Sequence, residues 1–343
     1  MKIKQYVIFV IISSFVTSVS ALQAADQYVG AWFWRANWDV GVLKTIRESE
    51  RLSYPIFQAG LISNTPNPTL NMYGATYSYI SDRWSLTYGG ALGDSKYEYN
   101  QNFLNSFSSG YTLIPFQTNV YARRSDHDLT FTRRISDTGF SFFVGLKAQD
   151  YFYSLAGDTG IGIRNSSGYI NPSVSNSSQY MYSKSAGFSG GFSYTLPLTD
   201  RLSSTVQLGG IFLKGSLESD TLLNFSSANT FNGIPGNEVN FAYIRNSYSQ
   251  THSLKGETLR ITFDYKAEDN LILRLGYQGQ QATIEDSKIG NSVTSIYNNN
   301  SNTGLSYPLQ TNLLLLVRDA LGGSFDKSKD TFHGVTFAFI LKI

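Results

Sequence analysis

The chain has 343 residues and a formal charge of only +2 at pH 7, with 15% charged residues, 15% aromatic residues and no cysteine. Average soluble domains carry roughly 25% charged residues, so this composition is unusual for a soluble secreted enzyme. The near-neutral charge gives no electrostatic case for nucleic acid as a partner. The lack of cysteine excludes a disulfide framework and a lipoprotein thioester anchor.

The N-terminal segment predicts export. Two lysines precede a short apolar stretch, Tyr6 to Val16, and small residues follow as far as Ala21 and Ala24. A basic start, an apolar run and a small-residue cleavage site are typical of a secretory signal peptide. We therefore expect cleavage after Ala21 or Ala24, so that 1–24 is removed and 25–343 forms a single domain.

Three weak strand patterns come first in the mature chain, at Tyr28–Arg35, Trp38–Ile46 and Leu52–Ile62. Apolar and polar residues alternate less regularly here than farther along. Pro55 weakens the third strand, because proline cannot donate a hydrogen bond to a sheet ladder. These segments decide whether the chain supplies ten or twelve strands.

The rest of the chain repeats one unit, in which two alternating strands flank a short polar turn and a long polar segment follows. Alternation with a period of two predicts a strand that has one apolar and one polar face. A closing strand ends the series. The paired strands lie at 73–80 and 84–93, 128–135 and 140–152, 187–196 and 202–213, and 258–267 and 271–280, and the closing strand lies at 335–343.

A soluble antiparallel sandwich would alternate in the same way, with its apolar face inward. Two features favour a membrane barrel instead. Strands of about 9–11 residues match a tilted crossing of a bilayer, and short turns alternate with long loops as at the two ends of an outer-membrane barrel. No later apolar stretch reaches the about 20 residues of a transmembrane helix.

The closing strand is apolar at every second position, from Val335 to Ile343. It resembles the terminal strand that bacterial outer-membrane barrels present to their insertion machinery, with Ile343 in place of the usual final Phe. The resemblance implies an outer-membrane location, insertion through this strand, and contact with outer-membrane lipid and lipopolysaccharide.

With both ends in the periplasm the strand number is even. We therefore predict an all-β, antiparallel up-and-down transmembrane barrel of about twelve strands, with ten as the alternative. Short turns should face the periplasm, and long extracellular loops should lie at 94–125, 154–183, 217–253 and 284–330. Within the last loop, Leu309 to Leu321 could form a short helix folded inward.

Three histidines are candidate catalytic residues, because His127, His252 and His333 each precede a strand that descends from the extracellular side. Acidic residues lie nearby in sequence, namely Asp126, Asp128, Glu257 and Asp330. A His–carboxylate pair could activate water or hold a metal ion. This placement resembles omptin proteases and the barrel enzymes that trim lipopolysaccharide, although no omptin motif matches residue by residue. Solvated loop residues are the alternative, and we predict no metal site and no cofactor.

Charged residues on the polar faces are candidates for lining the lumen. A net basic interior would favour anions, because a narrow low-dielectric wall focuses the field. Internal ion pairs that fill the barrel are an equal alternative, since Asp264 lies among the bases. Many other inward positions carry small residues that leave space. The predicted lumen-lining residues are Arg134, Lys147, Arg260, Asp264, Lys266, Arg274 and Gln278.

Three functions remain open from the sequence. The first is a porin-like channel for small polar or anionic solutes. The second is a non-conducting surface-display barrel that binds partners through its long loops. The third is a hydrolase at the barrel rim.

Overall fold

The computed structural model describes residues 26–40, 67–107, 110–135, 138–159, 162–166, 169–231, 234–298 and 328–343. Within these ranges the chain forms antiparallel strands joined by turns. No helix in the described part of the chain is long and apolar enough to cross a membrane. The predicted signal peptide 1–24 and the predicted helix 309–321 lie outside the described residues.

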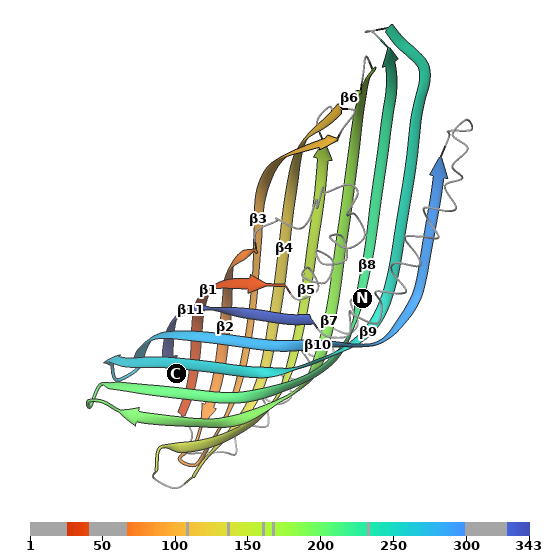
Figure 1. Cartoon of the computed structure of the whole chain (residues 1–343). Coiled ribbons are helices and arrows are strands. Elements are labelled where there is room, and N and C mark those ends of the chain that lie inside the picture. The colour runs from red at the N-terminus through yellow and green to blue at the C-terminus, as the bar shows by residue number, and fades with distance from the viewer. Residues whose placement is uncertain are drawn as a thin grey trace.

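Ten strands form a closed ring, and an eleventh, β6, is a short strand that pairs with β4 and β7. The ring order is β3-β2-β1-β11-β10-β9-β8-β7-β5-β4, and the pairing of β3 with β4 closes it. Figure 1 shows the N-terminal strand β1 lying beside the C-terminal strand β11. The strands are β1 (Asp26–Asp39), β2 (Thr69–Ile80), β3 (Trp84–Phe107), β4 (Gly110–Arg134), β5 (Phe140–Thr159), β6 (Gly162–Ser166), β7 (Tyr169–Pro197), β8 (Leu202–Phe231), β9 (Ile234–Glu268), β10 (Leu271–Asn298) and β11 (Ser328–Lys342).

The up-and-down barrel is confirmed, with ten strands rather than twelve. Tyr28–Arg35 belongs to β1, which continues through Trp38 as one strand. The predicted strand Leu52–Ile62 lies outside the described residues, and β1 pairs directly with β2, so the ring has no opening between them. The sequence divided β1 in two because its inner face carries tryptophans, which blurs the contrast between an apolar and a polar face.

The register fixes the barrel's dimensions. Starting from Leu92 on β3, the register partners on successive strands lead through β4, β5 and β7 to Ser216 on β8. In the opposite direction around the ring they lead to Ser204 on the same strand. The two end points differ by twelve residues, which is the stagger of the closed barrel. Twelve residues of stagger over ten strands correspond to a strand tilt of about 40° and a radius of about 10 Å. Long side chains from opposite walls of such a barrel can meet across the lumen.

The outer surface carries the apolar face. Exposed residues include Phe188 at 67%, Val335 at 56% and Leu275 at 53% relative exposure. Along β11 the exposed apolar positions run from Val335 to Ile343 and would cover about 20 Å of bilayer at the tilt above. A soluble sandwich buries such residues between its sheets, so the outward apolar band identifies a transmembrane barrel.

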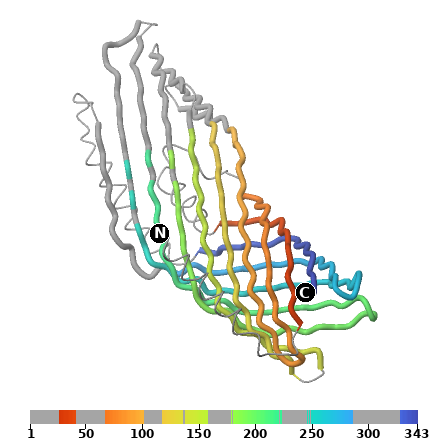
Figure 2. The backbone as a smooth tube through the Cα atoms, turned by 180° about the vertical axis from the view of Figure 1, so that it is seen from behind, coloured from red at the N-terminus to blue at the C-terminus, as the bar shows by residue number. Residues whose placement is uncertain are grey.

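Where the structure describes them, the segments predicted as long loops are mostly strand. Beyond Asp94, β3 stays paired with β4 as far as Phe107, and β9 reaches 35 residues. Figures 1 and 2 show β4, β5, β7, β8 and β9 rising far beyond β1, β2 and β11 on one side of the ring; we call this extension the wall. The outer face of the wall lies above the membrane and contacts water, so its residues need not be apolar. Without apolar alternation, the sequence of the wall predicts a loop and not a strand.

The short turns were predicted correctly where they are described. The backbone turns at 81–83, 198–201 and 269–270. At the fourth turn, Thr138 Oγ1 donates to the Ile135 carbonyl, and Gly139 takes a φ of 77°, which residues other than glycine rarely adopt.

Candidate functional site: a layer of side chains across the barrel

One hydrogen-bonded pair crosses the lumen. The side-chain amides of Gln149 on β5 and Gln280 on β10 bond to each other reciprocally, at 2.9 and 3.2 Å. These strands are not neighbours, because β7, β8 and β9 separate them on the shorter side of the ring. Both side chains are buried, so the pair joins opposite walls in a region closed to solvent.

A charged group crosses the lumen at the same level. Arg124 on β4 contacts Asp126 at 3.1 Å and Asp330 on β11 at 3.6 Å, and all three side chains are buried. The Arg124 guanidinium lies 4.0 Å from the ring centroid of Phe332, also on β11. Trp38 Nε1 on β1 donates to Asp330 at 2.9 Å. Arg124 therefore connects β4 to strands three and four places away around the ring.

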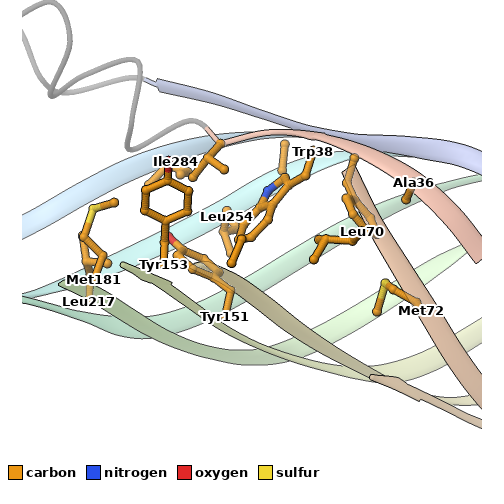
Figure 3. Close-up of a cluster of buried hydrophobic side chains, with 14 of the residues drawn as sticks. Ala36, Trp38, Leu70, Met72, Tyr151, Tyr153, Met181, Leu217, Leu254 and Ile284 are labelled. Atoms are coloured by element: carbon orange, nitrogen blue, oxygen red, sulfur yellow. The ribbon is translucent and has the colours of Figure 1, made fainter. Parts of the chain in front are cut away.

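Apolar side chains complete this cross-lumen layer. The rings of Trp38 on β1 and Tyr151 on β5 meet edge to face, with centroids 5.2 Å apart. Figure 3 shows side chains from strands all around the ring converging here. The buried apolar cluster contains, among others, Trp34, Trp38, Leu70, Met72, Tyr151, Tyr153, Met181, Leu213, Leu217, Leu254, Ile284 and Phe332.

The sequence reading missed this layer, although a signal for it is present. In the membrane band the apolar residues point outward, whereas at the level of this layer the apolar residues point inward and the polar residues point outward. On β1, Trp34 and Trp38 point inward and are buried, whereas Arg35 and Asn37 are exposed. A reversal of this kind marks the height at which the surroundings of the barrel change from lipid to water.

The predicted lumen-lining residues lie below the layer, mostly as pairs. Lys147 contacts Asp128 at 2.9 Å. Arg274 makes two bonds to Asp264, at 2.6 and 2.7 Å. Arg260 donates to Gln278 at 3.1 Å.

Two of the predicted lumen bases lie toward the short turns. Lys266 contacts Asp269 at 2.9 Å, and Arg134 is exposed. The ion pairs correspond to the filled-barrel alternative more closely than to a lumen of free positive charges.

The lower lumen still contains space. The inward positions of β3, β7 and β8 below the layer carry small polar residues that are half-exposed, in contrast to the buried residues of the layer. They include Ser85, Thr87, Ser189, Ser193, Thr205 and Gln207. The inner face is thus partly exposed on the side of the short turns and buried at the cross-lumen layer.

Two of the three histidines lie on the outer face, away from the lumen carboxylates. His127 points outward, where its Nδ1 lies 3.0 Å from the Tyr88 hydroxyl, while its neighbours Asp126 and Asp128 point into the lumen. His333 lies beside Tyr277 on the outer face, with ring centroids 6.1 Å apart.

His252 is the buried histidine, and its Nε2 lies 3.4 Å from Ser183 Oγ. Its Nδ1 has no hydrogen-bond partner, and burial lowers the pKa of this imidazole. Within the described ranges no cluster of histidine and acidic residues could hold a metal ion. On the neighbouring strand β10, the register partner of His252 is Asp286.

A row of aromatic side chains in contact with one another crosses the outer face of the wall. Lys96 lies over the ring of Tyr121, whose centroid is 5.9 Å from that of Phe152, and Phe152 stacks on Tyr180 at 6.3 Å. The Tyr180 hydroxyl donates to Asp220 at 3.4 Å.

The same row continues onto β9. Asp220 also accepts bonds from Arg245 and Ser247, and the bond from Arg245 holds the pKa of the Asp220 carboxyl below its usual value. An open hollow of about 540 Å³ lies beside Tyr121, lined by Lys96, Glu98, Asn119 and Ser154 among others.

Comparisons with known proteins find no matching protein-family model and no matching curated protein. Among solved structures, the chain is similar to the outer membrane protease OmpT from Escherichia coli, with 8% identity, a TM-score of 0.35, and coverage of 93% of this chain and 96% of that chain. It is also similar to the Pseudomonas putida toluene transporter TodX, with 9% identity, a TM-score of 0.24, and coverage of 95% and 91%. The attachment invasion locus protein Ail of Yersinia pestis gives 7% identity, a TM-score of 0.23, and coverage of 92% and 99%. Similarities this weak assign no substrate or partner to the chain.

Proposed function

We propose that this outer-membrane barrel is a non-conducting display scaffold, in which the wall above the bilayer is the binding part. The single observation that carries the proposal is the cross-lumen layer. Gln149 and Gln280 join β5 to β10, and Arg124 joins β4 to β11, so a solute path along the axis meets buried, paired side chains.

The wall supplies the binding surface. Its outer face carries Tyr121, Phe152 and Tyr180 in one row of ring contacts, with Lys96 at one end and Arg245 at the other. Tyrosine and arginine are enriched at protein–protein contacts, where aromatic rings provide area and arginine provides directed hydrogen bonds. The row supports a macromolecular partner better than a small solute.

The porin-like channel for small polar or anionic solutes remains the second candidate. The half-exposed small residues of the lower lumen favour it, since they leave the inner face partly exposed. The ion pairs of Lys147 with Asp128 and of Arg274 with Asp264 weaken the preference for anions, because each base already faces a carboxylate.

Planar-bilayer recording of the purified, refolded protein separates the two functions. We expect no conductance steps from the wild type in 1 M salt. The double variant Gln149→Ala/Gln280→Ala should show small openings, because it removes the amide pair that joins opposite walls. Ser189→Ala, which changes a small residue below the layer, is the matched control and should stay closed. Stable wild-type conductance would contradict the display proposal and support the channel.

A second experiment tests the wall. Lys96 and Tyr121 are register partners, so replacing 97–120 by an Asn-Gly turn closes the β3–β4 hairpin while leaving Arg124 in place. Cells that present the wild-type barrel should adhere to at least one of immobilised laminin, fibronectin and mucin, and the shortened variant should lose that adhesion. Phe152→Ala/Tyr180→Ala should weaken it without shortening the wall. Equal adhesion by all variants would refute a role for the wall.

A further inference from the structure

The open hollow on the outer face of the wall is lined by polar side chains around an aromatic ring. It has a volume of about 540 Å³ and lies across β3, β4 and β5. Volumes of about 300–1,000 Å³ are typical of small-molecule sites, so the hollow has room for a compact ligand group. Its outward side chains form two register rows, which are Lys96, Tyr121 and Ser154 in one and Glu98, Asn119 and Ala156 in the other.

The floor of the hollow is low on β5 because the residues there are small. Ser154 and Ala156 have short side chains, and the register partner of Ser154 on β7 is Tyr180. Tyr121 therefore lies on one side of Ser154 and Tyr180 on the other, and both rings contact Phe152, at centroid distances of 5.9 and 6.3 Å. The aromatic rings border a step in the surface, where a flat ligand face can pack against them.

Charge is balanced around the hollow. Lys96 and Glu98 are both exposed, and the Glu98 carboxylate accepts a hydrogen bond from Gln117 Nε2 at 3.3 Å. The next outward register pair toward the membrane, Asp94 with Arg123, again carries one charge of each sign. An anionic or cationic ligand would meet a like charge as well as an opposite one, so the charges favour a neutral ligand.

The hollow lies outside the membrane band. Leu92, at 46% relative exposure, is an apolar residue of that band on β3, and Lys96 lies four residues farther along the strand. At about 3.3 Å per residue, the hollow begins about 13 Å beyond Leu92. Its ligand therefore comes from water and not from lipid.

We infer that this hollow binds a neutral sugar unit of a glycan carried by the macromolecular partner. Sugar hydroxyls both donate and accept hydrogen bonds, so one sugar ring can pair with the Lys96 ammonium, the Glu98 carboxylate and the Asn119 amide together. The C–H face of the same sugar can pack on the ring of Tyr121. An apolar side chain of a protein would bury these polar groups without replacing their hydrogen bonds to water. The inference rests on the proposed binding role of the wall and names the class of ligand.

Binding of the detergent-solubilised full-length barrel to immobilised mucin, in a detergent without a sugar headgroup, tests this site. We expect the wild type to bind, and Asn119→Ala/Tyr121→Ala to bind at least about tenfold more weakly, because truncating an anchoring tyrosine commonly costs that much. Tyr121→Phe keeps the ring and should retain most of the binding, which separates a lost contact from lost folding. The matched control Asn71→Ala/Tyr73→Ala makes the same two changes at exposed positions of β2 and should bind like the wild type.

Treatment of the mucin identifies what is bound. Sialidase removes its acidic sugars and should leave binding unchanged, whereas mild periodate opens sugar rings at vicinal hydroxyls and should abolish binding. Loss of binding after sialidase would overturn the neutral class of ligand. No binding of the wild type to untreated mucin, binding that survives periodate, or equal binding by Asn119→Ala/Tyr121→Ala would each overturn the sugar site. The display proposal survives these outcomes if cells still adhere to laminin or fibronectin through the wall, so the two proposals fail separately.

Discussion

Arg124 is the residue on which the cross-lumen layer most depends. Its side chain is 2% exposed, and it faces two carboxylates, Asp126 and Asp330, that are themselves buried. Replacing Arg124 by methionine keeps most of the volume but leaves both carboxylates without this cation. Breaking a buried ion pair by removing one partner costs about 3–5 kcal/mol. The lost cation–π contact with Phe332 adds up to about 2 kcal/mol.

The free energy of unfolding, measured by urea titration in lipid vesicles with tryptophan fluorescence, should therefore fall by at least about 3 kcal/mol in Arg124→Met. A compensated variant gives the control. Arg124→Met/Asp126→Asn/Asp330→Asn removes all three charges together and should recover most of the loss, because a neutral set of similar shape avoids stranded charges. If the free energy of unfolding of Arg124→Met fell by less than about 1 kcal/mol, as it does when an exposed ion pair is removed, the layer would not exclude water.

Three other outcomes follow from particular residues. Phe263→Arg, on the lipid face, should cost about 2–4 kcal/mol of unfolding free energy in vesicles, while Ser193→Arg, on the half-exposed inner face, should cost much less; equal costs would argue against the assigned faces. The pKa of His252 is lowered in the folded protein, so below pH 6.5 the unfolded chain takes up a proton before the folded chain does. The free energy of unfolding should therefore fall as the pH decreases from 6.5 toward the folded pKa, by up to about 1.4 kcal/mol per pH unit. His252→Gln should remove this part of the slope, and urea titrations at pH 5 and 7.5 would show whether it does. Gly139→Ala should cost about 1–3 kcal/mol, because its φ of 77° is strained for alanine and an added Cβ would lie 2.6 Å from the Thr195 carbonyl oxygen; a neutral effect on the urea midpoint would show that the turn relaxes freely.

The membrane part of the fold was readable from the sequence. Along β11 and β9, positions such as Phe337 and Phe263 alternate with polar or small residues, and the structure exposes these apolar residues as expected. The turn at Gly139 was equally clear, because short polar turns have a strong local signature. These features depend on residues close together in sequence, and a period of two reports them directly.

The wall and the layer depend on relations that one strand does not contain. Gln149 and Gln280 bond across 131 positions of sequence, and no local pattern indicates which glutamines face each other. The lumen bases were easier, because Asp264 and Gln278, the partners of Arg274 and Arg260, were expected on the same polar face, and Asp269 lies three positions from Lys266. For the histidines, parity alone separates His127 from Asp126 and Asp128, because adjacent residues of a strand point to opposite faces.

The position of the layer explains why this barrel fills its lumen. Below the layer, lipid covers the apolar outer face and the inner face can stay polar. Above it, water wets the outside, so residues such as Trp38 and Phe332 can leave water only by turning inward. Inward-facing rings at the same height on strands around the ring meet at the axis, because the barrel radius is only about 10 Å. The layer therefore gives the wall a hydrophobic core where the bilayer no longer supports it. The contacts that stabilise the wall are the same contacts that close the lumen.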